Sequence, residues 1–251
     1  MSMGEEPGTS LLARVRIVLS RPTHPGNIGA AARAMKTMGL SRLVLIEPRR
    51  FPDPQATALA AGAADLLATT AVCDSLEQAL AGTALAIGFT ARRRDLGPAA
   101  HDARGAAAQA VAEAQTGAEV ALVFGTEMAG LSNEELIRCQ RIAHIPADPT
   151  FSSLNLAAAV QIAAYELRLA AVGATPLGDE RTPPATFEEL EGLFAHLESS
   201  LVASGFLDPY NPRRLMERLR RLFGRARLES QEVNILRGML AAWDAAGRRG
   251  R

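Results

Sequence analysis

The feature that most constrains this chain is a repeated alternation of short apolar segments with alanine-rich segments between residues 14 and 172. Apolar runs that are nearly continuous are typical of parallel strands buried on both faces of a sheet. The expected strands are Arg14–Leu19, Arg42–Ile46, Thr70–Cys73, Leu85–Phe89, Val120–Phe124 and Arg141–Ile145. The alanine-rich segments have helical composition and comprise Ile28–Met38, Gln55–Ala63, Ser75–Leu80, Gly105–Gln115 and Asn133–Cys139. We therefore predict an α/β fold around a parallel sheet.

The pattern changes after a long helix that is expected to begin near Ser152. Glycine and proline breaks between residues 173 and 184 predict a linker. Three helical patterns follow it, at Phe187–Ala203, Pro212–Phe223 and Ser230–Ala246, with Trp243 expected as an apolar anchor among them. The predicted organisation is a flexible N-terminus at 1–13, an α/β domain at 14–172, the linker at 173–184, an all-helical C-terminal extension at 185–246 and a basic tail at 247–251.

Charge is balanced over the whole chain but not within the helical extension. The 27 basic and 27 acidic residues cancel, so the net charge does not demand a polyanionic partner. One short stretch is nonetheless dense in arginine, and it contains Arg213, Arg214, Arg218, Arg220, Arg221, Arg225 and Arg227. Such density is typical of a surface that contacts nucleic-acid phosphates. Alternatively, some of these arginines pair with Glu229 or Glu232 and hold the helices together.

Cysteine and histidine usage points away from a metal or redox centre. Cys73 and Cys139 have no metal-binding or redox spacing, and the four histidines are scattered. The first ten residues lack the order of a signal peptide, and no uncharged apolar run reaches the length of a membrane span. We therefore expect a cytoplasmic protein with no metal and no membrane partner.

Three short motifs carry the candidate chemistry, and the first is Asn27-Ile-Gly-Ala-Ala-Ala-Arg33 after the first strand. Asn27 is expected to cap the following helix, and Gly29 allows another backbone to approach it. Arg33 then projects from one face of that helix. A capped alanine-rich helix with one solvent-facing arginine is the alternative interpretation.

The second motif, Phe124-Gly-Thr-Glu-Met-Ala-Gly-Leu131, lies at the end of an expected strand. Ligands of open α/β sheets bind at the carboxyl ends of strands. Ser132 and Glu135 match a capping box, so the loop should lead directly into a helix. An ordinary glycine-rich turn is the alternative, and the motif lacks the Gly-Lys-Ser/Thr of a phosphate-binding loop.

The third motif joins Ile145-Pro to Ser152-Ser-Leu-Asn155 at the expected start of the long helix. Serines are common helix caps. Asparagine is a poor helix former, so Asn155 is unusual inside a first turn. Its side-chain amide is expected to hold a loop or a ligand.

Taken in this order, the three motifs resemble those of the SPOUT superfamily, in its 2′-O-methyltransferase branch. Two longer runs, residues 16–46 and 219–238, are similar to the bacterial TrmJ family of tRNA methyltransferases, and the resemblance covers about residues 14–246. It implies a parallel sheet whose C-terminal part forms a trefoil knot, an exception to the usual connection rules. It also implies S-adenosylmethionine as cofactor, S-adenosylhomocysteine as product, and a homodimer whose active site is completed across the interface.

The resemblance also implies roles for individual residues of this chain. The expected cofactor-binding residues are Thr90, Ala91, Gly125, Glu127, Gly130, Ile145, Ser153, Leu154 and Asn155. Arg33 and Asn27 are the expected catalytic residues, and the resemblance implies that Arg33 removes the proton of the ribose hydroxyl. Because a guanidinium stays protonated, the alternative is that Arg33 lowers the pKa of the hydroxyl and anchors the adjacent phosphate. The expected RNA-binding residues are Arg92, Arg93, Arg213, Arg214, Arg218, Arg221 and Arg225. Thr126 stands where a basic residue is frequent in the superfamily, which leaves a phosphate contact there in doubt.

The function that the resemblance implies is methylation of the ribose 2′-hydroxyl of nucleotide thirty-two, cytidine or uridine, in the anticodon loop of tRNA. The alternatives are the same chemistry on ribosomal RNA or another tRNA position, and a non-catalytic RNA-binding protein with this fold. An unrelated α/β nucleotide enzyme is disfavoured, because no phosphate-loop fingerprint is present.

Overall fold

A seven-stranded, all-parallel sheet forms the centre of the computed structural model, which describes residues 11–91, 100–173 and 183–249. The strand order is β3-β2-β1-β6-β4-β7-β5. The strands are β1 (Val15–Ser20), β2 (Arg42–Ile46), β3 (Ala71–Cys73), β4 (Thr83–Phe89), β5 (Ala100–Asp102), β6 (Glu119–Phe124) and β7 (Arg141–His144). The predicted parallel α/β fold is confirmed, with all six expected strands present. β5 was missed because it is short and polar, and no apolar run marks it.

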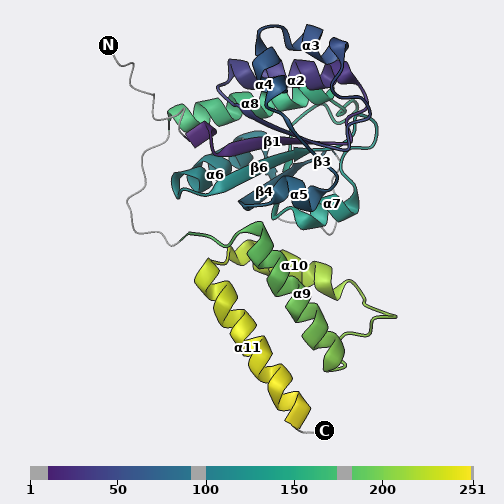
Figure 1. The fold of residues 1–251 in the computed structure, drawn as a ribbon, viewed down its shortest axis with the longest axis vertical. Coiled ribbons are helices and arrows are strands. Elements are labelled where there is room, and N and C mark those ends of the chain that lie inside the picture. Colours follow the sequence, from purple (N-terminus) through teal and green to yellow (C-terminus); the bar gives the residue numbers. More distant parts are fainter. Residues whose placement is uncertain (1–10, 92–99, 174–182, 250–251) are drawn as a thin grey trace.

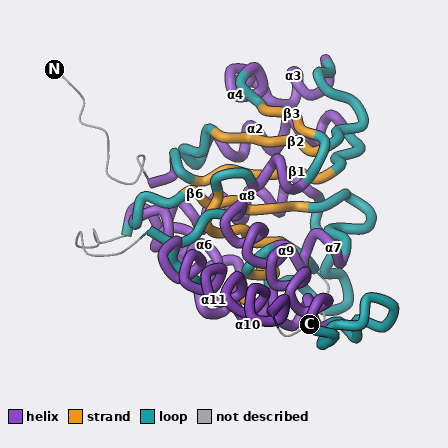
Figure 2. The backbone as a smooth tube through the Cα atoms, turned by 60° about the horizontal axis from the view of Figure 1, so that its bottom comes forward, coloured by secondary structure: helices purple, strands orange, loops and turns teal. Residues whose placement is uncertain are grey.

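Helices cover both faces of the sheet (Figures 1 and 2). The helices of the α/β layer are α2 (Pro25–Thr37), α3 (Pro54–Ala60), α4 (Ala64–Ala68), α5 (Leu76–Leu80), α6 (Ala103–Gln115), α7 (Asn133–Arg138) and α8 (Leu156–Val172). A short 3-10 turn at Ala61–Ala63 joins α3 to α4. Of these helices, α2, α6 and α8 pack on one face, while α5 and α7 pack on the other.

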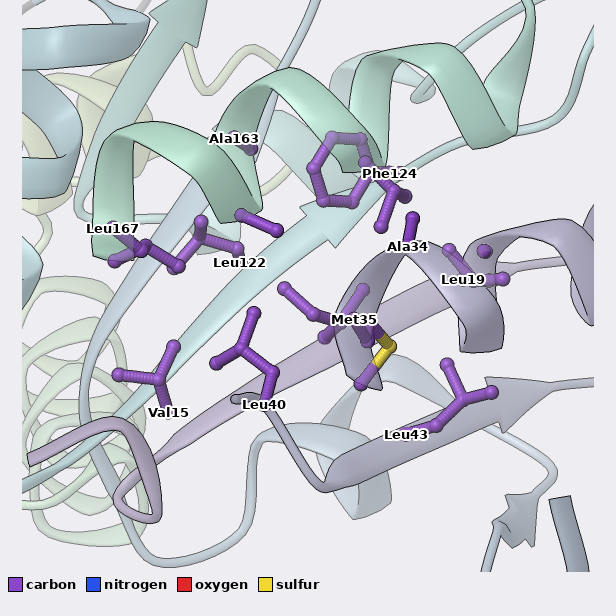
Figure 3. Close-up of a cluster of buried hydrophobic side chains, with 14 of the residues drawn as sticks. Val15, Leu19, Ala34, Met35, Leu40, Leu43, Leu122, Phe124, Ala163 and Leu167 are labelled. Atoms are coloured by element: carbon purple, nitrogen blue, oxygen red, sulfur yellow. The ribbon is translucent and has the colours of Figure 1, made fainter. Parts of the chain in front are cut away.

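Two hydrophobic clusters, one on each face, explain why the central strands are mostly apolar. Val15, Ile17 and Leu19 of β1 belong to the cluster under α2 and α8, whereas Val18 belongs to the cluster under α5 and α7. Figure 3 shows part of the first cluster, in which Val15 and Leu19 meet side chains from the neighbouring strands and the helices above them. A strand that buries both faces cannot alternate apolar with polar residues.

The C-terminal extension consists of α9 (Phe187–Ala203), α10 (Leu215–Ala226) and α11 (Ser230–Arg249), which lie below the sheet layer in Figure 1. Phe187 is buried in the second cluster of the sheet layer, and the Glu188 carboxylate accepts hydrogen bonds from the Gly82 amide at 2.8 and 3.0 Å. Arg227 forms an ion pair with the buried Glu113 of α6. The extension is therefore docked on the sheet layer through both apolar and charged contacts.

Two expectations about this extension were wrong. α10 begins at Leu215 rather than Pro212, because Arg213 and Arg214 adopt positive φ angles of 47° and 57°, which an α-helix does not allow. Trp243 is 63% exposed, since it lies past Leu240, the last residue of the cluster that α11 shares with α9.

None of the helices in the described ranges is both long and apolar enough to cross a membrane. Within the same ranges, no group of three or more His, Cys, Asp or Glu side chains could hold a metal ion.

Candidate functional site

A cavity of about 220 Å³ opens at the carboxyl ends of β4, β6 and β7. Its floor includes Phe89 and Phe124, the last residues of β4 and β6, whose rings stack with centroids 4.6 Å apart. The rest of the lining comes from the loop after β6 and from the segment that precedes α8. This is the edge of a parallel sheet at which ligands of α/β proteins bind.

Most of the residues expected to bind a cofactor line this cavity. They are Thr90, Ala91, Gly125, Glu127, Gly130, Ile145, Ser153 and Leu154. Asn155 lies next to them, at the start of α8. The sequence reasoning missed Phe89, Phe124, Thr126, Met128, Ala129, Ser152, Leu156 and Ala159. Phe124, Thr126, Met128, Ala129 and Ser152 belong to the second and third motifs, so their places in those motifs were the available signal.

The carboxylate of Glu127 joins the second motif to the first. It accepts hydrogen bonds from the Thr23 amide at 3.0 Å, the Thr23 hydroxyl at 2.8 Å and the His24 amide at 3.0 Å. The side-chain amide of Asn27 donates a further bond at 3.0 Å. Partial burial raises the pKa of Glu127, but the bonds from Asn27, Thr23 and His24 outweigh it and lower the pKa to about 2.

Asn155 joins the third motif to the same network. Its Nδ2 donates to Oδ1 of Asn27 at 3.0 Å, while its own Oδ1 accepts from the amides of Ala157 and Ala158 at 2.9 and 3.3 Å. Side chains 100 and 128 positions apart are thereby connected in the order Asn155, Asn27, Glu127. The three sequence motifs meet at one place in the fold.

The structure corrects two details of these motifs. α8 begins at Leu156 and Asn155 is its N-cap, so the helix does not start near Ser152 and Asn155 is not inside its first turn. Asn27 does not cap α2. Pro25 starts that helix earlier, with His24 at the cap position. The Asn27 amide is thus available for Glu127 and Asn155.

The loop after β6 is closed tightly on itself. A Cβ added to Gly125 would lie 2.0 Å from the carbonyl carbon of Gly130 and 2.2 Å from the Leu131 nitrogen, so only glycine fits there. The Gly130 amide donates to the Thr126 carbonyl at 2.9 Å, and the Thr126 hydroxyl accepts from the Ala129 amide at 3.2 Å. Thr126 therefore has a structural part in the loop.

The segment that follows this loop is held just as firmly. The predicted capping box of Ser132 and Glu135 is present at the start of α7. The buried Glu135 also accepts hydrogen bonds from the Ser20 hydroxyl at 2.5 Å and from Arg21 at 2.9 Å. The loop and the helix that follows it are thus anchored to Ser20, the last residue of β1, and to the residues directly after it.

Arg33 is exposed on α2 and does not belong to the cavity lining. It forms no hydrogen bond or ion pair with another residue in the described part of the chain. The side chain is therefore available to a molecule outside this protomer.

The arginines expected to bind RNA lie in two places. Arg92 and Arg93 fall outside the described residues. The expected RNA-binding arginines of the extension are all exposed, and they are Arg213, Arg214, Arg218, Arg221 and Arg225. The ion pairs found in this region instead join Arg220 to Glu191, Arg227 to Glu113 and Arg214 to Glu217. The alternative pairing of Arg218, Arg221 or Arg225 with Glu229 or Glu232 does not occur among the described residues.

The Glu127 network makes a specific contribution to stability that depends on pH. Because the pKa of Glu127 in the folded protein is about 2, against 4.5 for an unperturbed glutamate, this contribution is present above about pH 4.5 and is lost as the pH falls toward 2. We expect Glu127→Gln to destabilise the protein at pH 7 by about 1–3 kcal/mol, the range for hydrogen bonds to a charged group. The difference from the wild type should shrink at pH 3.

Urea unfolding at pH 7 and pH 3 measures this difference. Glu198→Gln, at an exposed carboxylate of the extension, is the control and should give a small difference at both pH values. A Glu127→Gln effect that is the same at both pH values would contradict the assigned network.

Known proteins resemble this chain over both of its parts. A model of the SpoU rRNA Methylase family matches residues 14–165, and a model of the tRNA methyltransferase TrmJ, C-terminal domain, matches residues 188–251. The tRNA (cytidine/uridine/adenosine-2'-O-)-methyltransferase TrmJ of Pseudomonas aeruginosa is 50% identical over 240 residues, which cover 92% of this chain and 93% of the relative.

Solved structures agree with this match. TrmJ from Z. mobilis superposes with a TM-score of 0.80 at 34% identity, over 91% of this chain and 98% of that one. An AdoMet-bound rRNA methyltransferase from Sinorhizobium meliloti superposes with a TM-score of 0.50 at 25% identity, over 62% of this chain and 56% of that one.

Proposed function

Because this chain belongs to the TrmJ family of SpoU methylases and is an S-adenosylmethionine-dependent tRNA 2′-O-methyltransferase, we propose that its target is nucleotide thirty-two of the anticodon loop. The target base is cytidine or uridine, and the enzyme works in the cytoplasm, where its substrate is. The observation that supports the methyltransferase site is the side-chain connection from Asn155 through Asn27 to Glu127. It brings the three family motifs together beside a single cavity.

The cavity suits S-adenosylmethionine. Its apolar floor of Phe89, Phe124 and Ile145 can accept an adenine, and the glycine-rich loop after β6 lets backbone groups approach the polar parts of the ligand. The residues that we propose to hold the cofactor are Thr90, Ala91, Gly125, Glu127, Gly130, Ile145, Ser153, Leu154 and Asn155. When bound, the cofactor supplies an activated methyl group on a positively charged sulfur.

The protein must then position the ribose hydroxyl and help it lose its proton. Glu127 is unsuited to accept that proton, because its pKa of about 2 is far below neutral and its carboxylate is already hydrogen bonded. Asn27 uses both ends of its amide within the protein. We therefore assign both as positioning residues that keep the loops of the cavity in place.

Arg33 is the residue that we propose to contact the substrate. A protonated guanidinium next to the 2′-hydroxyl lowers the pKa of that hydroxyl and binds the adjacent phosphate. The proton then passes to a phosphate oxygen or to water. Arg33 does not line the cavity of its own protomer. This assignment therefore requires the Arg33 side chain to reach the cavity of another protomer.

A homodimer satisfies this requirement. Arg33 follows Asn27 by six residues, which is about 120° around the helix and about 9 Å along it, so the two side chains leave α2 in different directions. Two large apolar side chains at or near the cavity, Met128 and Phe151, are 93% and 80% exposed. We propose that a second copy covers this rim and supplies its own Arg33 to the cavity.

Removing the 2′-oxygen of one nucleotide in the tRNA tests the proposed position. We expect methyl transfer to an unmodified tRNA, and no transfer to the same tRNA carrying a 2′-deoxyribose at nucleotide thirty-two. A matched tRNA with the deoxyribose at a neighbouring loop position should still be methylated. Transfer that survives the first substitution, or that occurs only on ribosomal RNA, would overturn the assigned position.

A further inference from the structure

The loop that joins α9 to α10, residues 204–214, presents two aromatic rings to solvent. Tyr210 is 97% exposed, more than any other large hydrophobic side chain in the described residues, and Phe206 is 72% exposed. The loop is nevertheless well organised. Leu207 between them is buried, and the Tyr210 amide donates to the Asp208 carboxylate at 2.9 Å. The rings are therefore held outward by an ordered backbone.

A cavity of about 340 Å³ is lined by Phe206, and Tyr210 immediately precedes another of its lining residues, Asn211. Its lining combines the aromatic Phe206 with the carboxylate of Asp208, the amide of Asn211 and the guanidinium groups of Arg213 and Arg218. A flat apolar surface next to hydrogen-bond donors and acceptors matches the two properties of a nucleobase, its face and its polar edge. A lipid or an apolar peptide would leave most of these polar groups without a partner.

The charge around the cavity favours a polyanion. Arg213, Arg218 and Arg221 are exposed and form no ion pair with an acidic side chain of the described residues. Arg214 lies 3.9 Å from Glu217, at the long end of an ion pair. Three arginines of α10, Arg218, Arg221 and Arg225, recur at steps of three and four residues, so they form a stripe that begins at the cavity. Such a stripe can follow the phosphates on either side of a bound base.

We propose that this loop is a binding site for an unpaired base of the tRNA other than the methylated nucleotide. The rings of Tyr210 and Phe206 stack on the base, Asp208 and Asn211 contact its edge, and Arg213 and Arg218 bind the flanking phosphates. The base must be unpaired, because the faces of paired bases are covered by their neighbours in a helix. The inference rests on the proposed function only in taking tRNA as the ligand.

The position of the loop is compatible with one RNA that reaches both sites. In Figures 1 and 2 the loop between α9 and α10 projects from the same side of the molecule as the carboxyl ends of the strands. The methylation cavity lies at that edge of the sheet. A tRNA can thus place one nucleotide in the cavity and a second, unpaired one on the loop.

The test compares the binding of an unmodified tRNA transcript to the full-length variants Tyr210→Leu and Tyr210→Phe. Leucine keeps the apolar character but lacks the ring, so we expect Tyr210→Leu to weaken tRNA binding about tenfold, the effect of losing one stacked base. Tyr210→Phe keeps the ring and should retain most of the affinity. Trp243→Leu, at an exposed aromatic residue of α11, is the control and should bind as the wild type does.

The salt dependence of tRNA affinity distinguishes the contribution of base stacking from that of phosphate contacts. Tyr210→Leu should leave the slope of log affinity against log salt concentration unchanged, whereas Arg213→Gln should reduce it by about one. Wild-type affinity in Tyr210→Leu, with tRNA methylation intact, would overturn the base-binding site and leave the proposed function standing. If the wild type binds no tRNA, both are overturned. If Tyr210→Leu weakens tRNA binding but the wild type methylates another nucleotide, only the proposed position falls.

Discussion

Replacing Arg33 by alanine is expected to reduce methyl transfer to tRNA by about 10²–10³-fold, the range for removing one group that stabilises developing charge in an active site. Binding of S-adenosylmethionine should change little, because Arg33 does not line the cavity of its own chain. Its exposed position on α2 also predicts little change in stability. Single-turnover rates with saturating cofactor and tRNA measure the effect.

Lys36→Ala provides the matched control on the same helix. Lys36 is likewise exposed, but it binds the Asp65 carboxylate and the Gly62 carbonyl at the far end of α2. We expect this variant to methylate tRNA at the wild-type rate. Wild-type activity in Arg33→Ala would show that Arg33 is not part of the active site.

Replacing Gly125 by alanine is expected to reduce methyl transfer by a different route, through weaker binding of the cofactor. The added Cβ would lie 2.0 Å from the backbone of Gly130, so the loop after β6 must open. Overpacking of this kind costs about 1–3 kcal/mol, and the displaced loop is a wall of the cavity. If that cost falls on the bound form, we expect S-adenosylmethionine to bind about 5- to 150-fold more weakly, as measured by calorimetry.

Gly62→Ala is the control for this change, because a Cβ at Gly62 meets no atom within 4 Å. It should bind the cofactor and unfold as the wild type does. Normal cofactor affinity in Gly125→Ala would show that the loop does not form part of the cofactor site.

The variants Arg33→Ala and Gly125→Ala together test whether two protomers contribute to one active site. If one protomer supplies Arg33 and the other supplies the cavity, a dimer that contains one chain of each variant has one intact site. After unfolding and refolding as an equal mixture, about a quarter of the wild-type activity should return, since half of the dimers are mixed and each has one of its two sites intact. No recovery, with mixed dimers shown by mass spectrometry, would place Arg33 and the cavity in the same chain.

Local patterns in the sequence predicted the architecture well because the physical cause is local. A strand such as β1 must be largely apolar on both faces when helices cover both. Its residues Val15, Ile17, Val18 and Leu19 display this directly. The capping box of Ser132 and Glu135 likewise depends on residues three positions apart. β5 was not predicted from the sequence, because its pairing with β7, rather than its own composition, makes it a strand.

The detail of the site was not accessible to such patterns. Asn27 was expected to cap a helix, yet its amide binds Glu127 and Asn155, 100 and 128 positions away. Trp243 was expected in a core, but whether an apolar residue finds a neighbour depends on where the packed helix ends. The order of the three motifs carried information about function that no single motif contained.

The central claim is that this chain transfers a methyl group to a ribose 2′-oxygen of tRNA. The most direct measurement incubates the wild-type protein with labelled S-adenosylmethionine and unmodified tRNA, digests the RNA and identifies the labelled nucleoside by mass spectrometry. We predict a labelled 2′-O-methylcytidine or 2′-O-methyluridine from the anticodon loop. A label on a base, or no label although both the cofactor and the tRNA bind, would contradict the account.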